Sequence, residues 1–169
     1  MDGLGEIGYC AGASRWFCGV REHLVFTPHG MIACVTQVPG NRHDVKGLYA
    51  LLYTSFRGRL LGDNASTPGH SLDRELREQR IEVVAMTRKD SRQPLPSHTR
   101  AFVKLNRGRV ERRISLFNQQ LHANRTLCRS ARHYRARRWF KALSHDVSRY
   151  LNPKLRRAPE SMLHFRIAA

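Results

Sequence analysis

Apolar residues in the segment 107–121 recur at the spacing of a helix that buries one face. They stand at i, i+4, i+7 and i+11, as Val110, Ile114, Phe117 and Leu121, so the pattern predicts an amphipathic helix. Its first turns carry one carboxylate, Glu111, among four arginines. A lone acid in such a field is ordinarily a charge partner on a solvated face. The alternative is that Glu111 holds a metal ion beside a phosphate backbone.

The pattern upstream alternates between strands and helices. Residues 16–38 form two β-rich runs around the turn Thr27-Pro28-His29-Gly30, which predicts a hairpin. A helix is expected from Asp44, as its N-cap, to Phe56, and Leu48, Leu51, Leu52 and Ser55 form its packing stripe. Short apolar strands at 59–63 and 81–86 enclose a helix over 71–80 capped by Ser71. A strand, a helix and a strand at this spacing predict a parallel pair.

The remaining segments complete a single domain over residues 16–151. Residues 1–15 hold four glycines and no period, so we expect a disordered leader there, and residues 87–106 read as a long polar loop. The basic segment 125–151 should be a helix or helix pair that packs through Leu127, Tyr134, Phe140, Leu143, Val147 and Tyr150. Residues 152–169 are expected to be an irregular tail.

Charge narrows the range of partners. The 169 residues carry a net charge of +17. Residues 100–157 alone hold 17 lysines and arginines against two acids, Glu111 and Asp146, which gives +15. An excess of this size destabilises a compact chain unless a polyanion screens it, so nucleic acid is the expected partner.

Cysteine usage and hydropathy place the chain in the cytoplasm. Four cysteines, Cys10, Cys18, Cys34 and Cys128, show no C-x-x-C pair or zinc-ligand spacing, so we expect reduced thiols. The chain has neither a signal-peptide pattern nor an apolar run that could cross a bilayer. We therefore expect a cytoplasmic bacterial protein associated with the nucleoid, with no membrane partner.

The order of these elements and three motifs resemble the DDE transposases of bacterial insertion sequences, from about Phe17 to Tyr150. The run from Gly19 to Leu48 is similar to the family's central hairpin and the Pro-Gly-Asn-x-His-Asp start of its next helix. LLGDNAST is similar to the Leu-x-Gly-Asp-Lys-Gly-Tyr motif, with Asp63 as the second catalytic aspartate. RGRVERRISLFNQQ is similar to the Arg-x-x-x-Glu signature, with Arg107 as its arginine and Glu111 as the third acid.

The resemblance implies an α/β fold: a ribonuclease H-like mixed sheet flanked by helices, with a basic helical C-terminal region. It also implies phosphodiester cleavage and strand transfer with Mg²⁺ or Mn²⁺, held by Asp63 and Glu111 together with a first aspartate. That aspartate belongs on a strand before the hairpin, where this chain offers only Asp2 and Glu6. We therefore expect the first strand and the first acid to be missing, so that metal binding and catalysis fail.

Other departures concern the motifs themselves. Asn64-Ala65-Ser66 stands where the family has Lys-Gly-Tyr, Lys104 replaces the tyrosine expected before Arg107, and the lysine expected near Asn118 is absent. The function predicted is a truncated, inactive DDE transposase. The alternatives are a non-catalytic basic DNA-binding remnant and an RNA-associated basic protein.

The arginines are the predicted DNA contacts: Arg107, Arg109, Arg112, Arg113, Arg125, Arg129, Arg132, Arg135, Arg137 and Arg138. Binding through them would be independent of sequence and sensitive to salt. Trp139 and Phe140 among these cations could stack on bases, but aromatics at helical spacing favour a core role for Phe140, and Trp139 stays open. His23, His29 and His43 lack ligand spacing, so we expect no metal role. The chain could form homo-oligomers or associate with a full-length transposase.

Overall fold

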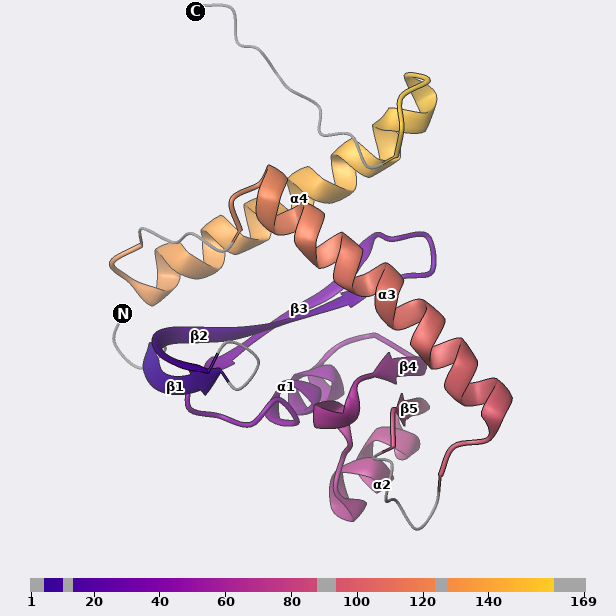
Figure 1. The fold of residues 1–169 in the computed structure, drawn as a ribbon. Helices are drawn as coiled ribbons and strands as arrows, with labels where there is room; N and C mark the ends of the chain where they lie inside the picture. Colours follow the sequence, from indigo (N-terminus) through magenta and orange to yellow (C-terminus); the bar gives the residue numbers. More distant parts are fainter. Residues whose placement is uncertain (1–4, 11–13, 88–93, 124–127, 160–169) are drawn as a thin grey trace, which may run out of the picture. The chain divides into compact units, whose positions relative to one another are not determined.

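The computed structural model describes residues 5–10, 14–87, 94–123 and 128–159. It has the expected α/β class, with antiparallel and parallel strands accompanied by helices (Figure 1). The chain divides into two compact units. Of the described residues, 5–10, 14–23, 36–87 and 94–111 form the central unit, and 24–35, 112–123 and 128–159 form the C-terminal unit. Each unit has its own buried side chains and is described separately below.

The antiparallel sheet contains the predicted hairpin and one strand that was not predicted. Its order is β1 (Glu6–Cys10), β2 (Arg15–Phe26) and β3 (Ile32–Pro39). The prediction of a disordered leader is therefore wrong for residues 6–10, because β1 pairs with β2 from Glu6 opposite Gly19 to Cys10 opposite Arg15. A glycine interrupts the alternation of apolar and polar residues by which a strand is recognised in a sequence.

Close backbone packing explains a glycine in β1. A Cβ atom on Gly8 would stand 2.0 Å from the carbonyl oxygen of Gly40, which follows β3. Arg21 ties the same region together, since its guanidinium donates to the carbonyls of Gly40 and Tyr9 at 2.9 and 2.8 Å. Gly8, one of the glycines that looked like a sign of disorder, allows this approach.

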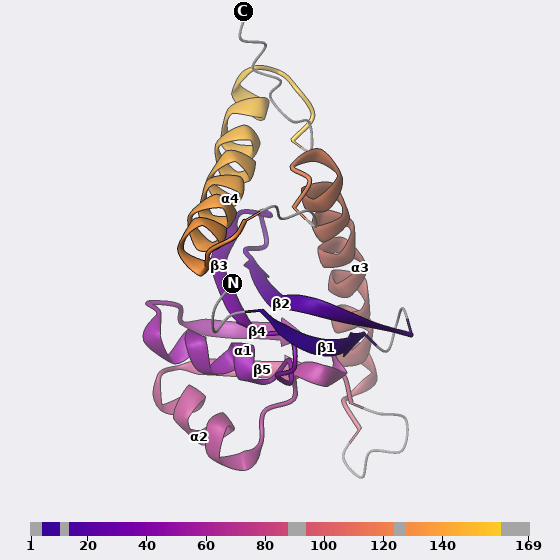
Figure 2. The same cartoon turned by 90° about the vertical axis from the view of Figure 1, so that its left-hand side faces the viewer.

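The predicted parallel pair is confirmed in the central unit. Strands β4 (Gly58–Gly62) and β5 (Ile81–Ala85) pair in parallel. Helix α2 (His70–Glu78) joins them and packs against β5 (Figure 2). Leu72, Leu76 and Ile81 are almost fully buried. Gly69, and not Ser71, is the N-cap residue of α2, because Ser71 lies inside the helix and donates to Glu75 at 3.3 Å.

The helix predicted over 44–56 is much shorter. It consists of one α-helical turn, α1 (Lys46–Tyr49), and a 3₁₀ turn, η2 (Ala50–Tyr53). Thr54 ends it in an extended conformation, and its hydroxyl donates to the Leu51 carbonyl at 2.8 Å, which competes with further helix. Asp44 is not the N-cap, which is Val45, but an ion partner of Arg21 at 3.2 Å.

The predicted helix at 107–121 begins earlier than the sequence indicated. Helix α3 spans Ser97–Gln120, so the second half of the expected 87–106 loop is helical, while residues 88–93 lie outside the described residues. Phe117 is 2% exposed, as its place on the predicted stripe requires, whereas Val110 and Ile114 are half-buried. The division between the two units falls inside α3, after Glu111.

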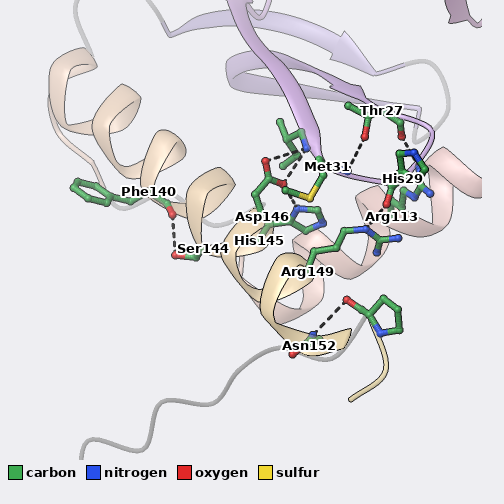
Figure 3. Close-up of polar contacts among 12 residues, drawn as sticks. Thr27, His29, Met31, Arg113, Phe140, Ser144, His145, Asp146, Arg149 and Asn152 are labelled. Atoms are coloured by element: carbon green, nitrogen blue, oxygen red, sulfur yellow. Dashed lines mark hydrogen bonds and ion pairs between the residues drawn. The ribbon is translucent and has the colours of Figure 1, made fainter. Parts of the chain in front are cut away.

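The C-terminal unit is held together by polar contacts to the hairpin turn. Helix α4 (Ala131–Lys154) places Arg149 so that its Nε donates to the carbonyl of His29 at 2.6 Å (Figure 3). From α3, Arg113 donates to the carbonyls of Thr27 and Pro28, both at 3.1 Å. The carbonyls of Pro28 and His29 are thereby paired with guanidinium groups, and the Thr27 carbonyl accepts from Arg113 in addition to the Gly30 N–H at 2.8 Å within the turn.

The packing face predicted for the basic segment is wrong, although the helix itself is confirmed. Tyr134 is buried, but Phe140, Leu143 and Tyr150 are each more than half exposed, and Val147 is 38% exposed. Residue 127 lies outside the described residues. The buried face of α4 instead carries polar groups together with Tyr134 and Ala142: Arg138, Ser148 and Asn152.

Candidate active site and nucleic-acid surface

Asp63 stands directly after β4, where the sequence placed the second catalytic aspartate. Its carboxylate caps the short 3₁₀ turn η3 (Asn64–Ser66). Oδ1 accepts hydrogen bonds from the backbone N–H of Ser66 at 3.1 Å and from its hydroxyl at 2.8 Å. The residue is exposed. Ser66, which occupies the place of the family tyrosine, therefore fixes the orientation of this carboxylate.

Glu111 and Arg107 form an ion pair on α3. Their four-residue separation puts both side chains on one face of the helix. Arg107 Nε lies 2.7 Å from Glu111 Oε1, and the two side chains are 54% and 60% exposed. The hydrogen bond and the charge of Glu111 raise the pKa of Arg107. An exposed pair of this kind adds little stability, so both groups remain available to a ligand.

Asp63 belongs to the same electrostatic neighbourhood as this pair. After the contributions of Glu111, the charge of Asp63 also raises the pKa of Arg107. All three residues lie in the central unit. Two carboxylates that stand 48 positions apart in the sequence thus both raise the pKa of one guanidinium, and Glu111 alone is in contact with it.

His23 on β2 is a neighbour that sequence reasoning did not connect with Asp63. Burial lowers its pKa, while the charges of Asp44 and, more weakly, Asp63 raise it and that of Arg21 lowers it. Its Nε2 atom is buried without a hydrogen-bond partner, and the ring leaves no room for a Cβ on Gly47. Nothing in the sequence spacing indicated this position, because it arises from the packing of β2 on α1.

Asp63 and Glu111 are exposed carboxylates, and carboxylate oxygens are a ligand type that Mg²⁺ prefers. A Mg²⁺ ion is held by several oxygen ligands, including substrate phosphates. Within the ranges that the structure describes, no group of three His, Cys, Asp or Glu side chains could hold a metal ion. The described residues alone do not complete such a site.

Two acids precede the hairpin, and the structure describes only one of them. Asp2 lies outside the described residues. Glu6 begins β1, the edge strand of the antiparallel sheet, and is exposed. The expectation of a disordered leader around Glu6 is therefore corrected. Among the described ion pairs and hydrogen bonds, none joins Glu6 to Asp63 or Glu111, so no contact supports Glu6 as a metal ligand.

Most of the arginines predicted to bind DNA are exposed, as a phosphate contact requires: Arg107, Arg109, Arg112, Arg129, Arg132, Arg135 and Arg137. Arg113 is half-buried and donates to the hairpin turn. Arg125 lies outside the described residues. The exposed group belongs to α3, to α4 and to the segment that precedes α4.

Arg138 is the exception that corrects the prediction. It is 5% exposed, and its guanidinium lies 5.3 Å from the centroid of the Phe117 ring. It donates a short hydrogen bond to the carbonyl of Ala123, and burial lowers its pKa to about 10. A guanidinium enclosed in this way links α3 to α4 and is not presented to phosphate.

A comparison with protein families decides the identity. The sequence model of the transposase DDE domain matches residues 3–146. The chain belongs to this family. The match includes Asp63, Arg107 and Glu111 as well as the hairpin, and it extends into α4. No curated protein and no solved structure matches the chain at a significant level.

Membership of the family sets the broad function. Transposases of this family act on DNA and generally use divalent metal ions, and the α/β structure is consistent with a ribonuclease H-like domain. In the ranges that are described, every helix is too short or too polar for a bilayer crossing. The prediction of a DDE transposase is therefore confirmed at the level of family, fold and DNA as substrate class.

Proposed function

We propose that this chain is a transposase DDE domain that binds DNA through its exposed arginines and does not cut it. The observation that carries the first half is the set of exposed arginines on α3, on α4 and in the segment before α4, in a chain that matches the family over residues 3–146. The second half rests on the departure from the family motif beside Asp63, where Asn64-Ala65-Ser66 stands in place of Lys-Gly-Tyr.

The roles proposed for the site residues follow from their contacts. Asp63 is oriented by Ser66, and Glu111 is held by Arg107 at 2.7 Å. A divalent metal, when bound, would activate the attacking oxygen and stabilise the leaving oxygen. The charge of Arg107 would attract a phosphate toward Glu111, whose own charge would otherwise repel it. Positioning of DNA is the part of the family function that we assign to these residues.

The proposed DNA contacts are non-specific and electrostatic. Seven exposed arginines are available, and backbone contacts of this kind release counterions. If six or more reach phosphate, the affinity for duplex DNA falls by roughly 10³-fold or more between 50 and 200 mM salt. A chain with such affinity and no cleavage would compete with an intact transposase for DNA, which is the partner relationship that we propose.

A nicking assay tests the proposal. The purified chain is incubated with supercoiled plasmid and Mg²⁺ or Mn²⁺, beside a variant carrying Asp63→Asn, which keeps an oxygen for Ser66 but removes the charge. We expect binding by both proteins and nicking by neither. Metal-dependent nicking by the wild-type chain that Asp63→Asn abolishes would overturn the inactivity. An affinity for DNA that is indifferent to salt would overturn the arginine contacts.

A further inference from the structure

One face of α4 is exposed and carries aromatic and cationic side chains together. At 3.6 residues per turn, the following residues lie on one side of the helix: Arg132, Arg135, Trp139, Phe140, Tyr150 and Lys154. We call them the aromatic-basic face. Trp139, Phe140 and Tyr150 are 57%, 69% and 59% exposed. Figure 3 shows Phe140 on the side of α4 away from Asp146 and the hairpin turn.

The exposure of these rings is a consequence of what the opposite face binds. Tyr134, Arg138 and Asn152 are buried on that other face, and Asp146 accepts from the backbone of Ile32. Burying the aromatic-basic face against the same unit would require the loss of these contacts. The aromatic rings therefore belong to the surface of the folded C-terminal unit and are not a misplaced part of its core.

The exposed charged side chains on this face are all cations, and Asp146 at its border is half-buried. Asp146 is the only acid of α4, and its carboxylate is engaged with Ile32 and with His145. Arg132, Arg135 and Lys154 are exposed. A second copy of this chain would bring the same cations against each other, in a protein whose net charge is already +17. A polyanion is the ligand with complementary charge.

Cations and aromatic rings lie together on this face, and a nucleotide offers a partner for each: its phosphate for a cation and its base for a ring. Lys154 Nζ lies 4.0 Å from the centroid of the Tyr150 ring, so a cation and an aromatic side chain meet at one end of the face. At the other end, Arg135 precedes Trp139 by about one helical turn. About 17 Å of helix separates Trp139 from Tyr150 at 1.5 Å per residue. Leu143 and Val147 lie between them and supply apolar surface.

We propose that the aromatic-basic face binds single-stranded DNA, with unpaired bases stacked on Trp139, Phe140 and Tyr150 and phosphates on the neighbouring cations. The inference rests on the proposed function in that DNA is the ligand, and it adds the form of DNA. Bases in a duplex are already stacked on each other, whereas unpaired bases offer their faces to aromatic side chains. The face therefore favours single strands over duplex of the same phosphate number.

The chain offers a matched control for a tryptophan test. It has two tryptophans, and Trp16 on β2 is 72% exposed and packs at 5.2 Å from Tyr9 in the central unit. The full-length chain is titrated with a single-stranded oligonucleotide and with a duplex of equal phosphate number at one salt concentration. Trp139→Ala and Trp16→Ala variants are compared, and Trp16→Phe leaves Trp139 as the sole fluorescent reporter.

We expect Trp139→Ala to weaken single-strand binding by about 5- to 100-fold, the effect of losing one stacked base. Duplex binding should change by less than about twofold, Trp16→Ala should resemble wild type, and Trp139 fluorescence should be quenched by the single strand. An equal loss for both forms of DNA would overturn stacking. Dimers in wild type that become monomers in Trp139→Ala would assign the face to self-association and also overturn it. No binding of either DNA by wild type would refute the proposed function itself.

Discussion

The carboxylate of Asp146 accepts the backbone N–H of Ile32 through both of its oxygens, at 2.9 and 3.2 Å, across 114 positions of sequence. The same Oδ1 lies 2.8 Å from His145 Nδ1, and the His145 ring meets Phe117 edge to face. A charged acceptor at the first residue of β3 thus connects the hairpin to α4 (Figure 3). Asp146 carried no predicted role, because the sequence does not show which backbone group it reaches.

Removing this acceptor should destabilise the protein. We expect Asp146→Ala to lower the free energy of unfolding by about 1.5–3 kcal/mol, since a hydrogen bond to a charged group is lost and a backbone N–H is left unpaired. Asp146→Asn keeps one oxygen and should cost less. Chemical denaturation followed by circular dichroism measures both.

As a control, Asp73→Ala removes an exposed helical ion pair with Arg77 and should cost no more than about 0.5 kcal/mol. Equal losses in the two alanine variants would contradict the interpretation.

On α4, one arginine is proposed to contact DNA and another stabilises the fold, and mutations can distinguish these two roles. Arg135 is exposed, whereas Arg138 is buried over Phe117 and bound to the Ala123 carbonyl. Arg138→Ala should cost about 1–3 kcal/mol of stability because it leaves a buried acceptor unpaired. Arg135→Ala should leave stability unchanged and lower the salt slope of DNA binding by about one. Thermal melts and salt titrations decide, and a reversed pattern would refute the assignment.

Gly108 lies between Arg107 and Glu111, inside α3, and a Cβ atom there would meet nothing within 4 Å. Gly108→Ala should stabilise the protein by about 0.5–1 kcal/mol, because glycine loses more backbone freedom in a helix than alanine does. Denaturation midpoints measure the effect. Gly30→Ala is the contrast, since Gly30 has a φ of +86° and its Cβ would stand 2.5 Å from Arg149 Nε. That variant should lose about 1 kcal/mol or more, and a gain there would contradict the described turn.

The ion pair at the candidate site should matter little for folding. Glu111→Gln is expected to change stability by no more than about 0.5 kcal/mol, because both partners of the pair are more than half exposed. A thermal melt checks this. The result would make Glu111→Gln a clean probe of DNA and metal binding. A larger loss of stability would show that Glu111 has a structural role.

Burial of His23 makes stability depend on pH. Its pKa in the folded protein is lowered from 6.5, chiefly by burial, so between that lowered value and 6.5 the unfolded chain binds more protons. Stability contributed by this residue is therefore complete above pH 6.5 and is lost as the pH falls. We expect His23→Asn to show a smaller decrease in melting temperature than wild type between pH 7.5 and 5.5. A titration of His23 by NMR with a midpoint at or above 6.5 would contradict the prediction.

Local sequence patterns were sufficient for the parts of the central unit that carry the candidate site. Two short apolar runs around an amphipathic helix predicted β4 and β5 as a parallel pair, and Asp63 follows β4 where its motif placed it. The four-residue spacing of Arg107 and Glu111 by itself predicts that they meet on a helix, and they do. These features depend on contacts close in sequence or on one hydrogen-bonded pairing, so period and spacing determine them.

Tertiary structure decided which face of a helix is buried. Periodicity predicted α4 as a helix, but Phe140 lies at the surface and Arg138 lies inside. The reason is that the buried face is chosen by partners distant in sequence: Phe117 and the Ala123 carbonyl for Arg138, and the Ile32 N–H for Asp146. Likewise β1 packs closely on the residue after β3 because Gly8 has no Cβ. By itself, the sequence determined the family motifs and the excess of positive charge, and the fold determined which of those charges and rings are exposed at the surface.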